Sequence, residues 1–230
     1  IDPASARVVL VEGSPHVLPV YPESLSSRAQ RQLEELGVEV RTDALVVGID
    51  GEGVTLASGE RLAARTVVWA AGVRASSLGA ALPVDRDRAG RVLVAPDLSL
   101  PGYSNVFVAG DLAAVTVDGA PVPGVAPAAM QQGRHVARQV LADLAGAPRS
   151  DFRYRDKGSL ATIGRARAVA DFGRLRFGGP FAWFAWLAIH IVYLIGFRNR
   201  VFVVFQWAWQ YATFRRGARI ITDAVRRGRG

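Results

Sequence analysis

Short apolar runs, rich in β-branched side chains, recur through the first half of the chain. We expect buried strands at 7–11, 66–69 and 106–109, and further strands at 38–40 and 91–94. A strand that is apolar on both faces belongs in a sheet covered on both sides, which is typical of parallel sheets flanked by helices. The pattern therefore predicts an α/β fold.

Two segments between these runs show helical spacing instead. Residues 22–36 place leucines on one face, with Ser24 as the expected N-cap and Gly37 as the end. A second helix is expected over 127–144, because its first residue is a proline, whose missing N–H costs nothing in the first turn. Between 44 and 64, apolar and polar residues alternate around glycine-containing turns, which predicts a small antiparallel meander.

The last third of the chain combines strands with uncharged aromatic stretches. Residues 152–171 alternate enough for two strands, and residues 181–197 carry no charge. As a helix, this second stretch is about 25 Å long, whereas the hydrocarbon core of a bilayer is about 30 Å thick. Together with residues 201–214, it predicts two helices that lie in one leaflet as a monotopic anchor. The alternative is a transmembrane pair, and a dimer interface made by the same helices is compatible with the anchor.

Charge is distributed unevenly along the chain, whose net charge is +8. Residues 1–150 carry 13 basic and 16 acidic side chains, whereas residues 151–230 carry 15 basic and 4 acidic ones. A basic segment indicates either nucleic acid or an anionic membrane surface. Because these arginines flank aromatic stretches, membrane lipid is favoured and nucleic acid is not expected. The residues expected at the lipid interface are Trp183, Trp186, Trp207, Trp209, Arg215 and Arg216.

The chain contains no cysteine, and its three histidines are scattered. A disulfide framework and a cysteine zinc site are therefore excluded, catalysis by paired cysteines is not expected, and the histidine spacing indicates no metal site. Neither a nucleophile elbow nor a phosphate-loop lysine motif occurs.

The leading candidate site follows the run at 106–109, which ends in Gly110 and Asp111. Open α/β sheets bind ligands at the carboxyl ends of their strands, and a glycine there lets a ligand approach the backbone. The alternative for Asp111 is to cap a helix that begins at Leu112. The helix at 127–144 contributes a partial positive charge at its N-terminus, which stabilises a nearby anion.

Four motifs occur in order along the chain. They are Trp-Ala-Ala-Gly-Val at 69–73, Val-Phe-Val-Ala-Gly-Asp at 106–111, Ala-Pro-Ala-Ala-Met-Gln-Gln-Gly at 126–133 and Asp-Lys-Gly-Ser-Leu-Ala-Thr-Ile-Gly-Arg at 156–165. With the basic aromatic tail they resemble the later part of type II NADH:quinone oxidoreductase, a respiratory-chain family of FAD flavoproteins with two dinucleotide-binding domains. The resemblance implies hydride transfer from NADH to FAD and then reduction of a membrane quinone. It also implies a homodimer bound as a monotopic protein to the cytoplasmic face of a membrane.

The resemblance also assigns roles to individual residues. FAD is expected at Gly110, Asp111, Ala129 and Gln131, NADH at Glu12, Ala71 and Gly72, and the quinone side at Gln131, Gln132 and Lys157. An acid that follows a Rossmann strand binds the adenosine ribose and repels a 2′-phosphate, which favours NADH over NADPH. Each assignment has a plainer alternative: a solvated surface residue, or a tight crossing between domains for the small residues at 71–72.

Two departures from the family pattern limit this interpretation. No Gly-x-Gly-x-x-Gly turn occurs anywhere in the chain, and Pro127 replaces the first glutamine of the family motif Ala-Gln-x-Ala-x-Gln-x-Gly. The chain also lacks a starting methionine, so we expect part of a longer protein. The expected architecture is a partial Rossmann-like, two-dinucleotide-binding-domain flavoprotein: the remainder of an NADH domain at 1–73, the remainder of an FAD domain at 74–148, and a strand-and-helix membrane module at 149–230. The rival hypotheses are a non-catalytic, membrane-bound remnant and an arginine-rich nucleic-acid binder.

Overall fold

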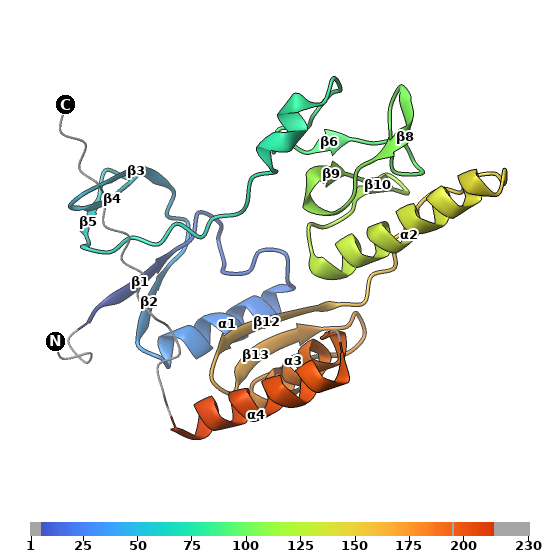
Figure 1. The fold of residues 1–230 in the computed structure, drawn as a ribbon. Coiled ribbons are helices and arrows are strands. Elements are labelled where there is room, and N and C mark those ends of the chain that lie inside the picture. The colour runs from blue at the N-terminus through green and yellow to red at the C-terminus, as the bar shows by residue number, and fades with distance from the viewer. Residues whose placement is uncertain (1–5, 195, 214–230) are drawn as a thin grey trace, which may run out of the picture. The chain divides into compact units, whose positions relative to one another are not determined.

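The computed structural model describes residues 6–194 and 196–213 (Figure 1). The chain divides into two compact units. The first comprises residues 6–48, 55–60 and the described residues from 159 onward, and the second comprises 49–54 and 61–158.

The first unit opens with a β-α-β arrangement. Strand β1 (Val8–Val11) pairs in parallel with β2 (Val38–Arg41), and helix α1 (Glu23–Glu34) connects them. The expected strands and helix are confirmed, but Ser24 is not the N-cap. The cap position is Pro22, without a side-chain hydrogen bond, so the helix begins at Glu23, two residues earlier than a cap at Ser24 would place it. Beyond the helix, Gly37 takes a positive φ of 82° and turns the chain toward β2.

A second sheet in this unit lies between helices. Strands β12 (Ser159–Gly164), β13 (Arg167–Asp171) and β14 (Arg176–Gly178) form an antiparallel sheet, of which the first two strands were expected and β14 was missed. Successive side chains of a strand point to opposite faces. Accordingly Val169 packs with Leu25 and Ala29 of α1, while its neighbours Ala168 and Ala170 pack with α3 (Pro180–Tyr193).

Helix α4 (Phe197–Thr213) follows α3 and contacts it. The arginines at 198 and 200, which we expected between the two helices, lie in the first turn of α4, because the chain reverses at Gly196 with a φ of 83°. Within 6–194 and 196–213, no helix combines the length and the hydropathy that a bilayer crossing requires.

The expected meander is present. Strands β3 (Val46–Asp50), β4 (Gly53–Leu56) and β5 (Arg61–Ala63) form a three-stranded sheet whose neighbours follow chain order. Asp50 closes the first turn by accepting hydrogen bonds from the N–H groups of residues 52 and 53. A Cβ at Gly53 would lie 2.1 Å from the carbonyl oxygen of Leu62, so only glycine fits there.

The second unit is built from short strand pairs around helix α2 (Ala126–Leu144). Strand β6 (Val92–Leu93) pairs in parallel with β9 (Ala113–Ala114), and β7 (Ser99–Leu100) pairs antiparallel with β8 (Tyr103–Phe107). A small hairpin, β10 (Thr116–Val117) with β11 (Ala120–Pro121), precedes α2. Short 3-10 helices η2 (Ser77–Ala81) and η3 (Gly110–Leu112) complete the unit. Its core comprises Val92, Leu98, Leu100, Val108, Ala113, Val115, Val122, Ala128 and Phe152.

Two strand predictions in this unit are wrong. Residues 66–69 form no strand, and Val68 and Trp69 are 81% and 63% exposed. The run at 106–109 is not a central buried strand, because β8 ends at Phe107 and, among the described strands, pairs only with β7. An apolar run becomes a strand only where a neighbouring strand supplies hydrogen bonds, and among the described residues none lies beside 66–69. The α/β class itself is confirmed.

Candidate functional site

The turn at Gly110 and Asp111 is seated directly on helix α2. Gly110 adopts a φ of 74°, which starts η3 immediately after β8. Its N–H donates to Oε1 of Gln132 at 2.6 Å, and a Cβ placed on it would lie 3.6 Å from that of Ala129. Gln132 is only 3% exposed, so its carbonyl oxygen has replaced water as the partner of this amide. The structure thus brings together Gly110, Ala129 and Gln132.

Asp111 presents an exposed carboxylate beside this contact. It forms no hydrogen bond or ion pair with any residue in 6–194 or 196–213, and its Oδ1 is 3.8 Å from the position of a Cβ built on Gly124. The helix-capping alternative is wrong. The cap position of η3 is Ala109, without a side-chain hydrogen bond, and residues 113–114 form β9 instead of continuing a helix. The carboxylate is therefore available to a ligand.

The N-terminus of α2 can attract an anion through the helix dipole, but it has few free backbone N–H groups. Pro127 has no N–H, and those of Ala128 and Ala129 both donate to the carbonyl oxygen of Val125. What remains is the partial positive charge of the helix dipole, which extends over the first turn. We therefore attribute any stabilisation of an anion here to this field.

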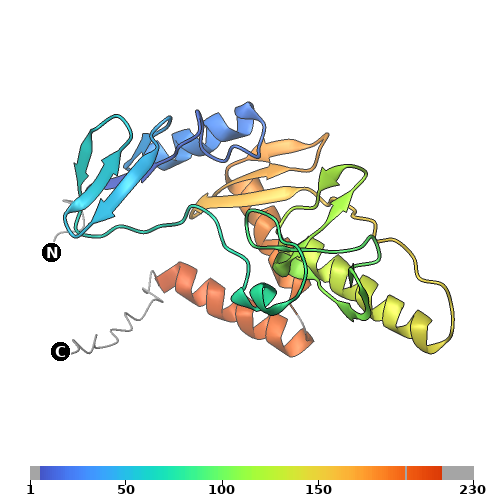
Figure 2. The same ribbon diagram turned by 90° about the horizontal axis from the view of Figure 1, so that it is seen from above.

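After α2 the chain returns alongside the helix, as both ribbon views show (Figures 1 and 2). Gln139 accepts the N–H of Ser150 at 2.9 Å. About two turns closer to the N-terminus of α2, Gln131 pairs with Arg155. Gln131 donates from Nε2 to the carbonyl oxygen of Arg155 and accepts its N–H through Oε1, both at 3.0 Å. The two glutamine amides thus bind the backbone of residues 150 and 155, in a segment that forms no strand.

Lys157 lies just beyond the residue that Gln131 holds. It is exposed and sits in a turn in which Oδ1 of Asp156 accepts the N–H of Gly158 at 2.8 Å. Gly158 has a φ of 87°, which ends the extended segment before β12. The contact at Arg155 therefore restricts where the segment presents Lys157.

The residues predicted for NADH fall in different units. Glu12 follows β1 in the first unit, where its Oε1 accepts the N–H of Ser14 at 2.8 Å. Ala71 and Gly72 belong to the second unit and lie in an exposed segment without secondary structure. Gly72 has a φ of 94° and no neighbour within 4 Å of an added Cβ, so its backbone is open to approach.

A buried histidine lies on the same helix as the glutamines. His135 is 3% exposed, packs edge-on against Phe152 at 5.4 Å, and its Nε2 has no hydrogen-bond partner among the described residues. Its Nδ1 lies 3.5 Å from Nε2 of Gln139. Burial, followed by the charge of Arg138, lowers the pKa of His135, so the ring is held neutral.

An arginine at the far end of α2 joins two carboxylates. Arg149 forms ion pairs with Asp97, at 3.0 Å, and with Asp143, and its guanidinium lies over the ring of Phe107. Burial alone would raise the pKa of Asp97, but hydrogen bonds from Ser99 and Arg149 outweigh it and hold the pKa below its usual value. The hydrogen bond from Arg149 likewise lowers the pKa of Asp143. The cluster ties the segment after α2 to β7 and β8.

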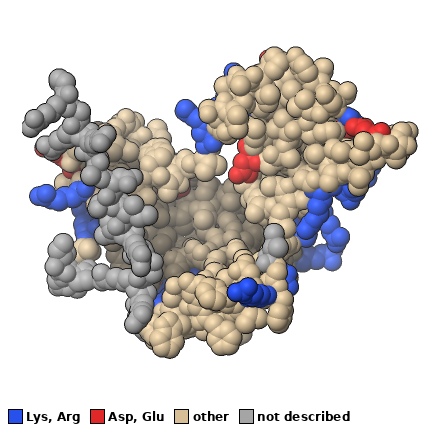
Figure 3. All heavy atoms as spheres, viewed as in Figure 1, with Lys and Arg blue, Asp and Glu red and all other residues tan. Residues whose placement is uncertain are grey.

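Of the tryptophans expected at a lipid surface, three pack against other aromatic rings and one is exposed. Trp186 of α3 stacks on Trp207 of α4, with ring centroids 5.8 Å apart and planes 9° from parallel, and Trp183 packs against Tyr211. Trp209 is 62% exposed. Figure 3 shows the surface over α4 as largely free of charged side chains. Arg215 and Arg216 lie outside the described residues. Other exposed apolar side chains on these helices are Phe181, Phe184, Val192, Phe197, Phe202 and Phe205.

Sequence reasoning identified the turn and the helix but missed what the glutamines do. Neither the backbone pairing of Gln131 nor the contact between Gln132 and Gly110 has a signal in the sequence, since the partners are 24 and 22 positions apart. No group of three or more potential metal ligands occurs in the described parts of the chain.

Comparison with known proteins identifies the family. Residues 3–133, more than half of the chain, match the model described as pyridine nucleotide-disulphide oxidoreductase, and residues 157–216 match the NDH2 C-terminal domain. The chain belongs to the pyridine nucleotide-disulphide oxidoreductase family. It is 45% identical to the type II NADH:quinone oxidoreductase Ndh of Mycobacterium tuberculosis, over 97% of this chain and 50% of that protein. The resemblance to the type II enzymes is thereby confirmed.

More distant relatives agree. The type II NADH:quinone oxidoreductase of Staphylococcus aureus is 35% identical over 79% of this chain and 45% of its own length. The structure of NDH2 from Plasmodium falciparum in complex with NADH has the same fold, with a TM-score of 0.80 and 16% identity over 93% of this chain and 59% of that one. The chain spans about half the length of the relatives it matches.

Proposed function

We propose that this chain is part of an FAD-dependent type II NADH:quinone oxidoreductase that takes electrons from NADH and delivers them to a membrane quinone. The observation that carries the proposal is the unpaired carboxylate of Asp111, presented on a turn that Gln132 fixes to α2. The similarity to Ndh over 97% of this chain supports the same assignment.

The residues around the turn fit a flavin cofactor. Asp111 would accept hydrogen bonds from the hydroxyl groups of the ribityl chain, while Gly110 and Ala129 leave room for it because neither has a side chain larger than a methyl group. When bound, FAD accepts a hydride from NADH and passes the two electrons on to a quinone. The positive end of α2 would stabilise the negative charge of the reduced ring, aided by the second N–H of Gln131 Nε2, since the first is bonded to Arg155.

For NADH we propose Glu12, Ala71 and Gly72. The carboxylate of Glu12, at the carboxyl end of β1, would accept hydrogen bonds from the adenosine ribose and repel a 2′-phosphate. The open backbone at Ala71 and Gly72 would let the nicotinamide half approach. These residues orient the donor and need not take part in a covalent step.

For the quinone side we propose Lys157 together with Gln131 and Gln132. Lys157 would place a positive charge beside the quinone oxygens. The two glutamines would act mainly by shaping this side of the site, since Gln131 holds the segment that carries Lys157 and Gln132 holds Gly110. Quinone reduction consumes two protons, which solvent can supply at this exposed position.

The membrane location is part of the same proposal. Helices α3 and α4 would lie in one leaflet as a monotopic anchor on the cytoplasmic face, with Trp209 and the exposed phenylalanines in contact with lipid. We retain the division into NADH-domain remainder, FAD-domain remainder and membrane module, with boundaries at 73 and 148, and we propose a homodimer. Such an anchor would let a water-soluble donor and a lipid-soluble acceptor meet on one enzyme.

The visible absorption spectrum tests the function. We would purify the protein that carries this sequence from its own membranes in detergent and record the spectrum before and after adding NADH. Flavin bands that bleach with NADH and recover with a quinone are expected. A colourless, membrane-bound protein would contradict the proposal and favour the non-catalytic remnant.

A matched pair of variants then tests the site. Asp111→Asn should lower the flavin content at least about fivefold, because a neutral amide is a weaker acceptor than a carboxylate. Asp118→Asn removes the same charge from the exposed β10–β11 turn of the same unit and should retain wild-type flavin content. Equal flavin content in both variants would remove Asp111 from the site.

A further inference from the structure

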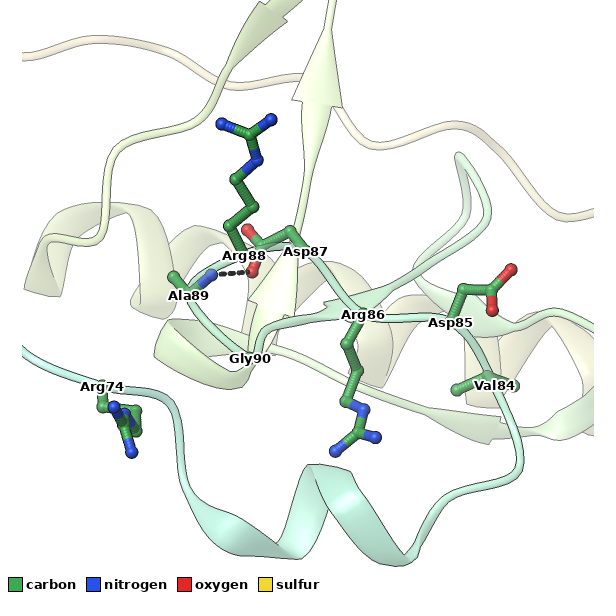
Figure 4. Close-up of a pocket in the computed structure, with 8 residues that line it drawn as sticks. All are labelled: Arg74, Val84, Asp85, Arg86, Asp87, Arg88, Ala89 and Gly90. Carbon is green, nitrogen blue, oxygen red and sulfur yellow. Dashed lines mark hydrogen bonds between the residues drawn. The ribbon is translucent and has the colours of Figure 1, made fainter.

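An open cavity of about 480 Å³ lies in the second unit (Figure 4). None of the residues assigned to FAD, NADH or quinone lines it, although Arg74 follows Gly72 by two positions. Its walls are Arg74 and the loop 84–90. Pockets for coenzyme rings are mostly apolar, whereas five of the eight residues that line this one are charged, namely Arg74, Asp85, Arg86, Asp87 and Arg88. The lining therefore suits a compact charged ligand and not an aromatic ring.

One carboxylate is fully used in shaping the loop. Oδ1 of Asp87 accepts the N–H groups of Ala89 and Arg91, at 2.9 and 2.8 Å, and Oδ2 accepts Nε of Arg91 at 2.7 Å. Gly90 has a φ of 81°, which closes the turn. Asp87 is thus neutralised by Arg91 and does not offset the charge of the other arginines.

The segment that carries Arg74, on the opposite side of the cavity, is joined to the loop 84–90 by a backbone hydrogen bond. The N–H of Ala75 donates to the carbonyl oxygen of Ala89 at 3.3 Å, which places Arg74 next to the loop. A Cβ on Gly79 of η2 would come within 3.1 to 3.4 Å of Leu112, Val92 and Gly90, so η2 packs closely against the same loop. On the loop side, Arg86 is held by a bridge to the fully buried Val92. Both arginines therefore project from fixed backbone.

Their guanidinium groups have no partner in the protein. Arg74 and Arg86 form no hydrogen bond or ion pair with any residue in the described ranges. Figure 4 shows Arg86 extending from the loop toward η2, with Arg74 across the same opening, on the segment that leads into η2. Asp85 and Arg88 extend from the other side of the loop. Two unpaired positive charges thus share one opening, without an opposing carboxylate between them.

We propose that Arg74 and Arg86 form a binding site for a phosphate group. Guanidinium groups present planar pairs of donors that match phosphate oxygens, and two of them balance a dianion. The phosphate can belong to a small soluble anion or to a lipid headgroup, and the two sources share this chemistry. Because the arginines are exposed, we expect a Kd on the order of 1 mM.

The first arm of the test uses inorganic pyrophosphate. We would titrate it into the full-length chain at constant ionic strength and follow the ³¹P line width. Saturable broadening is expected, with the Kd raised at least about fivefold in Arg74→Gln and in Arg86→Gln. Arg88→Gln removes the same charge from the same loop, but its side chain points away, so its Kd should stay within about twofold of wild type.

The second arm uses vesicles of phosphatidylcholine with and without phosphatidylglycerol. A lipid source predicts no saturable pyrophosphate binding, together with a phosphatidylglycerol-dependent binding that falls at least about fivefold in Arg74→Gln and Arg86→Gln but not in Arg88→Gln. The proposal is overturned if neither probe binds in this way, or if Arg88→Gln loses as much as Arg86→Gln.

Two controls separate this site from other effects. The side chains of Arg74, Arg86 and Arg88 are exposed, so each variant should keep the wild-type unfolding temperature. Arg86→Lys keeps the positive charge but loses the paired donors of the guanidinium group, and it should bind with intermediate affinity. Flavin content should stay at the wild-type level in every variant, since none of these residues is proposed to contact FAD.

Discussion

The side-chain amide of Gln131 pairs with the backbone of Arg155 through two hydrogen bonds of 3.0 Å, one in each direction. A glutamine amide can imitate a peptide group in this way, so α2 holds the returning chain as a neighbouring strand would. Gln139 makes a related contact with Ser150, whose N–H it accepts through Oε1 at 2.9 Å while its Nε2 donates to the hydroxyl oxygen at 3.3 Å. The segment between them therefore needs no sheet partner to remain ordered.

Replacing Gln131 with leucine should release this segment locally. Both hydrogen bonds are lost, but the freed backbone groups of Arg155 are exposed and can bind water, so the free energy of unfolding should fall by only about 1 kcal/mol. The amide of Arg155 should exchange with solvent at least about tenfold faster in native-state hydrogen exchange. Gln30→Leu, which removes a helix-surface pair with Glu34, is the control and should cost less than about 0.5 kcal/mol. Unchanged exchange at Arg155 would contradict the role of Gln131.

Gly110 and Gly124 both lie beside Asp111 and differ mainly in backbone conformation, so replacing each with alanine isolates the effect of that conformation on stability. An added methyl group meets only ordinary contacts at both, 3.6 Å from Ala129 at Gly110 and 3.8 Å from Asp111 at Gly124. Only Gly110 has a positive φ, of 74°, where a side chain costs about 1–2 kcal/mol. Thermal unfolding should therefore show Gly110→Ala destabilised by that amount, with Gly124→Ala within about 0.5 kcal/mol of wild type. Equal effects would mean that the turn relaxes.

Arg149 should make the second unit sensitive to acid. Its hydrogen bonds help hold the pKa of Asp97 and of Asp143 below the ordinary 3.8. A lowered pKa in the folded state contributes stability that is fully present above the unfolded pKa and is lost as pH falls through the folded pKa. Arg149→Met should thus lower the unfolding temperature by several degrees at pH 7, and this difference should shrink below pH 3.8. A difference independent of pH would show that Arg149 acts through packing alone.

His135 should produce a separate pH dependence nearer to neutrality. Because burial lowers its pKa in the folded state, the unfolded chain takes up a proton first as pH falls below 6.5. Stability should be complete above pH 6.5 and decrease below it, with a slope of at most about 1.4 kcal/mol per pH unit. His135→Leu should remove that slope, while the fit against Phe152 keeps its stability at pH 8 within about 1.5 kcal/mol of wild type. Chemical denaturation at several pH values would measure both, and an unchanged slope would exclude His135 as the cause.

Features that depend on neighbouring residues could be predicted from the sequence. The helices at 23–34 and 126–144, the end of the first helix at Gly37 and the open backbone at Gly110 all follow from local preferences: apolar spacing, proline at a helix start and the freedom of glycine. The absence of cysteine likewise excluded a disulfide framework and a cysteine zinc site within this chain without any structure. The family motifs could be recognised for the same reason, since each is contiguous.

The tertiary structure alone decided which apolar runs became strands and what the polar side chains contact. Residues 66–69 are mostly apolar, but they pair with no strand in the described part of the chain. Strand β8 stops at Phe107, because strand formation depends on hydrogen bonds from a distant segment. The contact of Gln132 with Gly110 joins residues 22 positions apart. An amide gains a partner only where folding has removed water from both groups, and no local pattern in the sequence records where that happens.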